Sequence, residues 1–384
     1  MYPTKTSDRT KNAKRFPGRP KGHKGTTRPK PKAPTVVMVP DKKCGCSRCG
    51  APLQETRVKH HLVEEIHNRQ PKQVIDFLEF DYKCTQCHAY ETSRHPDCPP
   101  EGVFGKNALA QTTLLKFDQR LPFDKVAEQM TQQYDLSMTP ATALDIARRV
   151  SVYLAPEYEV LIGKIRLAKV LYIDETGMKV DGKSHWMWVF VSDNETFYVL
   201  RKSRGKKVLT EVLGKNFKGY IVCDGLKSYS SYSDKLQRCW AHLLREVKWL
   251  SEQCDEGKRL HSELKKLYED VQASLVGNPP FWLRAQIRAC AENQLSGLLA
   301  KHYRRKEAVR FVGKVRNGFG HWFTFVTVTD VEATNNQAER ALKEPVVQRK
   351  IIGTLRNEKG MRIYETMISL LATWRQRGEN PYEA

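Results

Sequence analysis

Apolar residues recur at helical spacing over residues 104–161, before the part of the chain richest in short apolar runs. One helix face is marked by residues at positions i, i+3, i+4 and i+7: Phe123, Val126, Ala127 and Met130. After a short interruption, Thr139 offers an N-cap and Pro140 suits the first helical turn. A second helix is therefore predicted from Pro140 through Arg149, within a helical region over residues 101–165.

The pattern then changes to short apolar runs, which are typical of strands. Four strands are predicted: Val170–Asp174, His185–Ser192, Thr196–Leu200 and Tyr220–Cys223. A helix over Gly205–Leu213 separates the third strand from the fourth. Trp186, Trp188 and Phe190 share one face of the second strand, where a place in the core is favoured over a base-stacking platform. This order of elements predicts a mixed α/β domain.

Helical spacing returns after Trp240 and continues to about Val315. We expect a helical insertion over residues 241–315 that divides one domain into the parts 168–240 and 316–378. Such an insertion either contacts a substrate strand and shelters a site or simply packs, and the pattern favours neither reading.

The charge of the chain indicates a polyanionic partner. Lys and Arg exceed Asp and Glu by 22 among 384 residues, an imbalance that nucleic acid would neutralise. Residues 1–43 form an expected disordered basic tail. Its segment Pro17–Gly22 resembles an AT-hook with Arg19 and Lys21 as DNA contacts, although a generic basic tail would bind phosphates as well. No membrane association is expected, and the polar stretch Met1–Lys14 lacks the apolar core of a secretory signal, so a cytoplasmic, nucleoid-associated protein is expected.

Two C-x-x-C pairs predict a structural Zn²⁺ site. Cys46 and Cys49 form the first pair and Cys84 and Cys87 the second, a spacing that turns sulfurs toward one tetrahedral ion. Strand-like stretches such as Val74–Leu78 lie between the pairs, and a hairpin is expected to fill the gap. Substitute ligands are Cys44, His88 and Cys98. The prediction is a zinc ribbon over residues 44–98, and the alternative is a set of cysteines without metal.

Further basic residues are candidate DNA contacts. The helical region 101–165 suits a helix-turn-helix carrying Arg148 and Arg149, or a helical hairpin that only packs. A basic series downstream shows no clear period and is expected in loops that bind phosphate, or as a solvated rim: Arg349, Lys350, Arg356, Lys359 and Arg362. His242 either approaches a phosphate or, the favoured reading, is a structural histidine.

Three acids stand where a carboxylate needs compensation. Asp174 and Asp224 each end a predicted strand, and burying an acid there is costly unless a cation or donor offsets the charge. Together with Glu339 they could hold two Mg²⁺ or Mn²⁺ ions, which prefer hard oxygen ligands and support displacement at phosphorus. Taken singly, Asp224 suits a turn before Gly225, and Glu339 an exposed helix.

The surroundings of Glu339 predict a short helix. Asn335 or Asn336 can cap it, and Glu339 and Lys343 then lie along one face, where they could also simply form an ion pair. Pro345 is expected to end the helix.

Five ordered blocks resemble the transposases of the insertion sequence 66 family (TnpC-like). The blocks are Ile173–Gly177, His185–Val189, Cys223–Gly225, Cys239–Arg245 and Asn335–Arg340. Arg349–Lys350 and Asn380–Tyr382 fit as well, so the resemblance covers most of the chain. It implies a ribonuclease-H-like catalytic fold in which Asp174, Asp224 and Glu339 form a DDE triad, with Arg340, Arg349 and Lys350 near it as DNA contacts. Longer members continue beyond the position of Ala384, so the resemblance leaves open a short member or a truncated end, with catalysis by the three acids expected in either case.

The sequence therefore predicts a multidomain α/β protein. A zinc ribbon and a helix-turn-helix-like region precede a ribonuclease-H-like domain with a helical insertion. The resemblance implies metal-dependent DNA cleavage and strand transfer without a covalent enzyme intermediate. The alternatives are a nuclease of the same fold and a zinc-ribbon DNA-binding regulator with an inactive catalytic remnant. Expected partners are double-stranded DNA at the element ends and the target, further copies of the chain on that DNA, and accessory transposition proteins.

Overall fold

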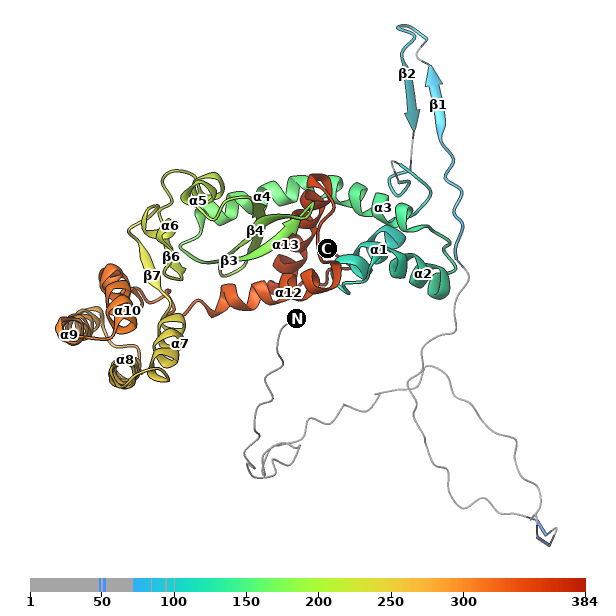
Figure 1. Ribbon diagram of the computed structural model, residues 1–384. Coiled ribbons are helices and arrows are strands. Elements are labelled where there is room, and N and C mark those ends of the chain that lie inside the picture. Colours follow the sequence, from blue (N-terminus) through green and yellow to red (C-terminus); the bar gives the residue numbers. More distant parts are fainter. Residues whose placement is uncertain (1–47, 50, 53–71, 84, 94, 100) are drawn as a thin grey trace. The chain divides into compact units, whose positions relative to one another are not determined.

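The computed structural model describes residues 48–49, 51–52, 72–83, 85–93, 95–99 and 101–384 (Figure 1). The chain divides into two units, Met1–Gln70 and Pro71–Ala384, and the described helices and strands belong to the second. The basic tail with Arg19 and Lys21, and the cysteines Cys46 and Cys84, lie outside the described residues. Within the described part, no helix is both long and apolar enough to cross a membrane.

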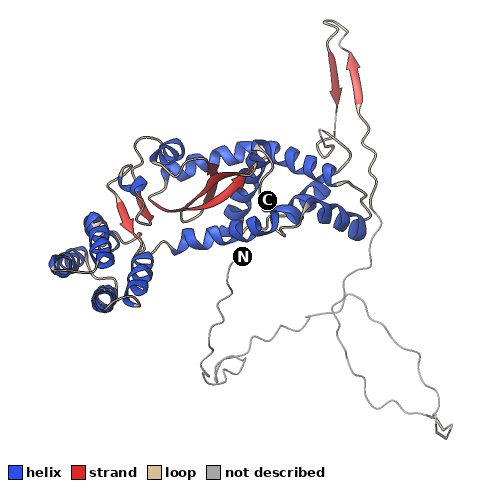
Figure 2. Cartoon of the chain, in the orientation of Figure 1, coloured by secondary structure: helices blue, strands red, loops and turns tan. Residues whose placement is uncertain are grey.

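A mixed five-stranded sheet forms the centre of the second unit, with helices around it (Figure 2). Its strands are β3 Val170–Val180, β4 Lys183–Val191, β5 Thr196–Arg201, β6 Tyr220–Cys223 and β7 Leu236–Arg238. The strand order is β5-β4-β3-β6-β7, with β4 antiparallel to β3 and β5, and β6 parallel to β3 and β7. The predicted mixed α/β class is confirmed, and Trp188 and Phe190 lie fully buried in its core.

The first strand is longer than predicted. β3 continues past Asp174 to Val180 because a two-residue turn, Asp181–Gly182, reverses the chain and lets β4 pair along its whole length. Both turn residues have positive φ, at 53° and 70°, the conformation that a tight hairpin requires. The short strand β7 was not predicted.

Four helices precede the sheet: α1 Lys106–Phe117, α2 Phe123–Tyr134, α3 Pro140–Tyr153 and α4 Ala155–Leu167. The predicted apolar face of α2 is buried, with Val126 and Met130 in a small core shared with α1 and α3. The N-cap prediction for α3 is confirmed, since Thr139 Oγ1 accepts a hydrogen bond from the Thr142 amide at 3.1 Å and Pro140 begins the helix. α3 reaches Tyr153, one turn beyond the predicted end.

Helices also follow strands β5, β6 and β7. They are α5 Lys206–Leu213, α6 Lys227–Ser230, α7 Trp240–Ser251, α8 Asp255–Ser274, α9 Phe281–Ala300, α10 Lys306–Asn317, the 3-10 turn Phe319–His321 and α11 Thr324–Thr327. Trp240 is fully buried at the start of α7, where its ring meets Tyr268 of α8, Trp322 and Phe323. One continuous hydrophobic core therefore joins these helices to the sheet.

The described N-terminal part holds one hairpin, β1 Phe80–Lys83 with β2 Tyr90–Ser93. Cys87, from the second C-x-x-C pair, lies exposed between the two strands. A strand-like stretch was predicted at Val74–Leu78, and those residues form no strand.

The expectation that Pro345 ends the Glu339 helix is wrong. Helix α12 runs Asn336–Ile352 with Pro345 inside it. A proline lacks the amide that would bond to the carbonyl four residues earlier, here Ala341. The Tyr198 hydroxyl donates to the Ala341 carbonyl at 2.8 Å, so the carbonyl that the proline leaves free is satisfied from the sheet.

The basic residues after Glu339 also differ from their predicted place in loops. Arg349 and Lys350 belong to the last turn of α12, and Lys359 and Arg362 belong to α13, Glu358–Gln376. Of the series, Arg356 alone lies between the two helices. Arg349 and Lys350 were predicted in a loop because Pro345 was expected to end the helix that in fact continues to Ile352.

Helix α13 covers the edge strand β5. Three side chains spaced four residues apart on α13 accept hydrogen bonds from three alternate amides of β5. The donor and acceptor pairs are Thr196 with Thr373, Tyr198 with Ser369 and Leu200 with Glu365. Four helical residues rise about 6 Å and two strand residues about 6.6 Å, so the two spacings match. The helix thereby pairs amides that an exposed edge strand would leave open.

Replacing Ser369 by alanine is expected to destabilise the protein by about 1–3 kcal/mol, because the buried Tyr198 amide loses its acceptor. Chemical unfolding of the purified protein measures the change. Ser274→Ala is the matched control, since Ser274 is exposed on α8 and makes the same kind of bond to the carbonyl four residues before it. Equal stabilities for the two variants would contradict the role given to the β5 amides.

Candidate active site

The parallel pairing of β3 with β6 places Asp174 and Asp224 side by side. Tyr172 pairs with Val222, so Asp174 and Asp224, each two residues further on, are level with one another. Side chains alternate between the two faces of a sheet, and each aspartate lies two residues after this pair. Both carboxylates therefore leave the sheet on the same side. Asp224 directly follows the last residue of β6, so the two acids meet where that strand ends.

Backbone amides already hold one oxygen of each aspartate. Asp174 Oδ1 accepts a hydrogen bond from the Glu175 amide at 2.9 Å, and Asp224 Oδ1 accepts one from the Leu226 amide at 2.8 Å. The second bond closes a turn directly after β6, which is the ordinary role considered for Asp224. Each acid keeps its other oxygen for a further partner.

Glu339 reaches the same place from the first turn of α12. The N-cap residue of this helix, Asn335, is fully buried, and its side chain donates to the Ile173 carbonyl at 2.8 Å rather than capping the helix. Its backbone amide donates to Cys239 Sγ at 3.1 Å. Asn335 therefore ties the start of α12 to the residue before Asp174 and to the start of α7.

The three acids interact electrostatically. Burial is the main cause that raises the pKa of Asp174 to about 7, and the neighbouring carboxylates of Glu175, Asp224 and Glu339 contribute to the rise, against the lowering effect of the Glu175 amide. Residues that are 50 and 115 positions apart in the sequence thus form one acidic cluster. A cation bound between the carboxylates would attract each of them and so offset their repulsion.

A buried network that the sequence analysis did not identify lies behind Asp174 and Asp224. Glu175 is buried and accepts hydrogen bonds from Arg204 Nε and the Tyr229 hydroxyl, both at 2.6 Å. The Arg204 guanidinium lies 4.7 Å from the centre of the Trp186 ring, and its Nη2 is 3.8 Å from Asp224 Oδ2. Its sequence signal is a second acid directly after Asp174, on the opposite face of the strand.

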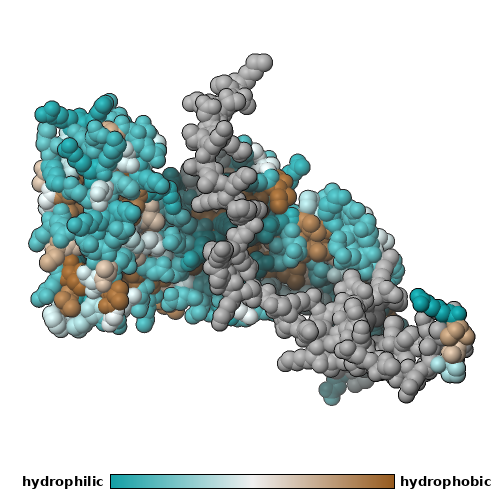
Figure 3. All heavy atoms as spheres, turned by 90° about the horizontal axis from the view of Figure 1, so that it is seen from below, coloured by the Kyte–Doolittle hydropathy of each residue, from teal (hydrophilic) through white to brown (hydrophobic). Residues whose placement is uncertain are grey.

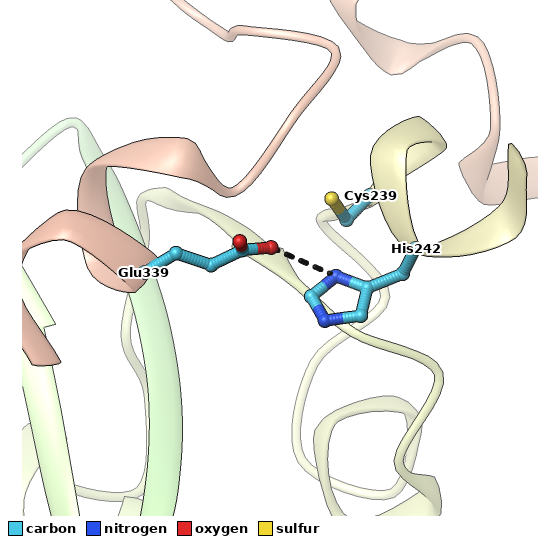
Figure 4. Close-up of side chains that lie close together, drawn as sticks. All are labelled: Cys239, His242 and Glu339. Carbon is cyan, nitrogen blue, oxygen red and sulfur yellow. Dashed lines mark ion pairs between the residues drawn. The ribbon is translucent and has the colours of Figure 1, made fainter. Parts of the chain in front are cut away.

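Helix α7 supplies the surroundings of Glu339 (Figure 4). His242 Nδ1 lies 3.4 Å from Glu339 Oε1, and Arg245 Nη2 lies 3.4 Å from Glu339 Oε2. The His242 and Glu339 atoms are at ion-pair distance, yet both are buried and neither has a hydrogen-bond partner among the described residues. His242 therefore faces the acidic cluster, whereas the sequence analysis favoured a structural role.

The predicted DNA contacts lie in different surroundings. Arg340 and Lys350 are exposed on α12. Arg349 Nη1 bonds to Thr176 Oγ1 at 3.3 Å and to the Gly177 carbonyl, so it holds α12 against β3 just past Asp174. On α3, Arg148 and Arg149 both pair with Asp145, at 2.9 and 3.1 Å, and Arg149 also donates to the Glu101 carbonyl. Cys49 of the first cysteine pair is exposed, as is Cys87.

Fold and site together define an α/β protein with a carboxylate cluster where β6 ends beside its parallel neighbour β3, a setting suited to divalent cations. The family model for the IS66 family of transposases matches residues 101–363, and the chain belongs to this family. The matched region contains all three acids.

A curated relative is the "Uncharacterized protein y4qI" of Sinorhizobium fredii (strain NBRC 101917 / NGR234). The two chains are 22% identical over 261 aligned positions, and the match covers 58% of this chain and 48% of the relative. The chain thus matches about half the length of this relative.

The raised pKa of Asp174 predicts a pH-dependent destabilisation of the metal-free protein. The folded state keeps the proton up to about pH 7, whereas an unfolded aspartate loses it near pH 3.8, so stability falls as pH rises between these values. Asp174→Asn removes the ionisation and is expected to stabilise the metal-free protein by about 1–3 kcal/mol at pH 8, with the gain vanishing near pH 4. Unfolding of both proteins at several pH values measures the gain.

The exposed Asp193→Asn is the control and should leave the pH profile unchanged. A gain from Asp174→Asn that is the same at pH 4 and pH 8 would show that ionisation of Asp174 does not cause it.

Proposed function

We propose that the chain is a DNA transposase that cleaves DNA and transfers the cut strand in a metal-dependent reaction. The observation that carries the proposal is the gathering of Asp174, Asp224 and Glu339 at the end of β6 in a chain of this transposase family. The sheet supports a ribonuclease-H-like catalytic domain, because three strands, a helix and a further strand follow one another as the resemblance implies.

The residues at the site fit Mg²⁺ or Mn²⁺. Three carboxylates supply hard oxygen donors, burial and then their mutual repulsion raise the pKa of Asp174, and the buried Glu339 Oε1 lacks a hydrogen-bond partner among the described residues. Asp174, Asp224 and Glu339 would hold two ions between them. When bound, such ions activate the attacking oxygen and stabilise the departing one in an in-line displacement at phosphorus.

The chain's own side chains hold these acids in place. Arg204 bridges Glu175 and Asp224 and thereby orients the second aspartate. Asn335 fixes Glu339 relative to Asp174 through the Ile173 carbonyl. Arg245 and His242 place positive or hydrogen-bonding groups beside Glu339, where a phosphate of the scissile strand would lie. In this reading no side chain acts as a covalent nucleophile.

Charge and surface support DNA as the substrate. The chain carries 22 excess positive charges, and the face seen in Figure 3 is largely hydrophilic over the described residues, with scattered hydrophobic side chains. Arg340 and Lys350 stand exposed on the helix that carries Glu339, where they would bind DNA phosphates. We propose the segments before the sheet as further DNA-binding modules: the AT-hook-like tail, the zinc ribbon with Cys46, Cys49, Cys84 and Cys87, and the helical region with Arg148 and Arg149.

Handling two element ends in one reaction calls for at least two copies of the chain on DNA, and accessory transposition proteins are proposed as further partners. A nuclease of the same fold would use the same acids but would not join strands. A strand-transfer assay with a precut 3′ end separates these two functions. A DNA-binding regulator would bind the ends without metal-dependent turnover.

Asp224→Ala is expected to abolish Mg²⁺-dependent cleavage of labelled element-end DNA while keeping most of the DNA affinity, because it removes a metal ligand but no proposed DNA contact. Cleavage is followed on a denaturing gel, and affinity by a gel shift at fixed salt. The exposed Asp234→Ala is the control and should cut like the wild type. Cleavage by Asp224→Ala at the wild-type rate would remove this residue from the mechanism.

Arg204→Lys is expected to raise the Mg²⁺ concentration for half-maximal cleavage by about tenfold, as losses of residues that orient metal ligands do. Lysine keeps the charge but loses the planar fork that bridges Glu175 and Asp224. A Mg²⁺ titration of the cleavage rate measures the shift. Arg166→Lys, which changes an arginine bonded to the Val212 and Glu211 carbonyls, should leave the titration unchanged. An unshifted midpoint for Arg204→Lys would assign Arg204 a purely structural role.

A further inference from the structure

Beside the three acids lies a second group of potential metal ligands with a different chemistry. Cys239, His242 and Glu339 each offer one ligand atom, and these atoms all lie within 4.8 Å of one another. Figure 4 shows the Cys239 sulfur, the His242 imidazole and the Glu339 carboxylate gathered around one point. A thiol, an imidazole and a carboxylate form a donor set that suits zinc and related ions better than magnesium.

The elements that carry these ligands are fixed in place. Cys239 is the N-cap residue of α7 and His242 lies one turn further on, so both project from the same end of one helix. Glu339 comes from the facing first turn of α12. The Asn335 amide joins the two helix starts by donating to Cys239 Sγ at 3.1 Å, which is also the kind of bond that orients a thiolate ligand.

Two of the three donors lack a partner. His242 Nδ1 and Glu339 Oε1 are buried atoms 3.4 Å apart, and neither forms a hydrogen bond within the described part of the chain. Leaving such atoms unpaired is costly, and an ion between them would satisfy both. Two ligand atoms of a tetrahedral zinc ion lie about 3–4 Å apart, so small side-chain rotations would bring all three donors into range.

We propose that Cys239, His242 and Glu339 form a binding site for a thiophilic divalent cation such as Zn²⁺ or Co²⁺, distinct from the Mg²⁺ sites of the three acids. Three protein ligands leave a fourth position open. Binding displaces the thiol proton of Cys239 to solvent and leaves the ion reachable from the side of His242 and Glu339, whose side chains are about a third exposed, at 35% and 30%.

Glu339 belongs to both sites, and this part of the inference rests on the proposed function. An ion held by Cys239 and His242 would draw the Glu339 carboxylate toward α7 and away from Asp174. Zinc is therefore expected to inhibit Mg²⁺-dependent DNA cleavage, by competition for one ligand rather than for the whole site.

The test measures metal binding by the full-length protein without DNA. Metal-free wild type, Cys239→Ser and His242→Gln are titrated with Co²⁺, following the thiolate-to-cobalt charge-transfer absorption, and the bound equivalents are counted by equilibrium dialysis. Cys290→Ser is the matched control, because Cys290 is an exposed cysteine of α9. Cysteines of the proposed zinc ribbon contribute equally to all four proteins.

Wild type and Cys290→Ser are expected to bind one equivalent more than Cys239→Ser and His242→Gln, with weaker charge-transfer absorption in Cys239→Ser. Thermal unfolding checks the variants, and if Cys239→Ser loses its fold, the partly exposed His242→Gln decides alone. An unchanged number of bound equivalents in folded His242→Gln overturns the site.

Zinc inhibition of wild-type cleavage is measured separately. Cleavage that continues unchanged when the cobalt-binding equivalents are filled with zinc overturns the sharing of Glu339. A protein that binds the extra equivalent but never cleaves DNA counts against the proposed function and leaves the metal site standing.

Discussion

The buried side chain of Asn335 is the constraint on which the site depends. Its amide group donates to the carbonyl next to Asp174, and its backbone amide donates to the sulfur at the start of α7. A sheet strand and two helices from distant parts of the chain therefore meet at one residue. Since an unpaired polar group in such a place costs on the order of 1–3 kcal/mol, the bonds favour a single arrangement of the three elements. This arrangement of the strand and the two helices sets how far Glu339 lies from Asp174.

Around Asn335, the repulsion between the carboxylates is opposed by hydrogen bonds and ion pairs that hold them in place. The acids destabilise one another, whereas Arg204, Tyr229 and the backbone amides hold Glu175, Asp174 and Asp224 in place. Such stored repulsion is common where a protein needs ligands preorganised for an ion that arrives later. Apolar burial of the sheet residues and of Trp240 supplies the stability that offsets it.

The sequence was sufficient for those features that depend on local periodicity or on strand ends. The four strands, the buried face of α2, the cap of α3 and the helices after Trp240 all follow from spacing.

Features that depend on distant partners were missed. Strand β7 contains Gln237 and Arg238, which look exposed in sequence but are buried, with Gln237 bonded to Trp322 and Phe325. Likewise α12 passes through Pro345 because Tyr198, far away in sequence, satisfies the carbonyl that the proline releases. The Arg204 bridge leaves only a partial signal, the acid directly after Asp174, because Glu175 and Asp224 come together with Arg204 only in the fold.

The covering of strand β5 by α13 has a consequence for the synthesis of the chain. The amide of Thr196 bonds to Thr373, a residue 177 positions later. At a synthesis rate of about 5–20 residues per second, the edge of the sheet waits roughly 10–35 seconds for its covering helix. During that interval the nascent chain presents an open strand to any other strand nearby. The synthesis of α13 therefore ends the period in which the open amides of β5 are available to another strand.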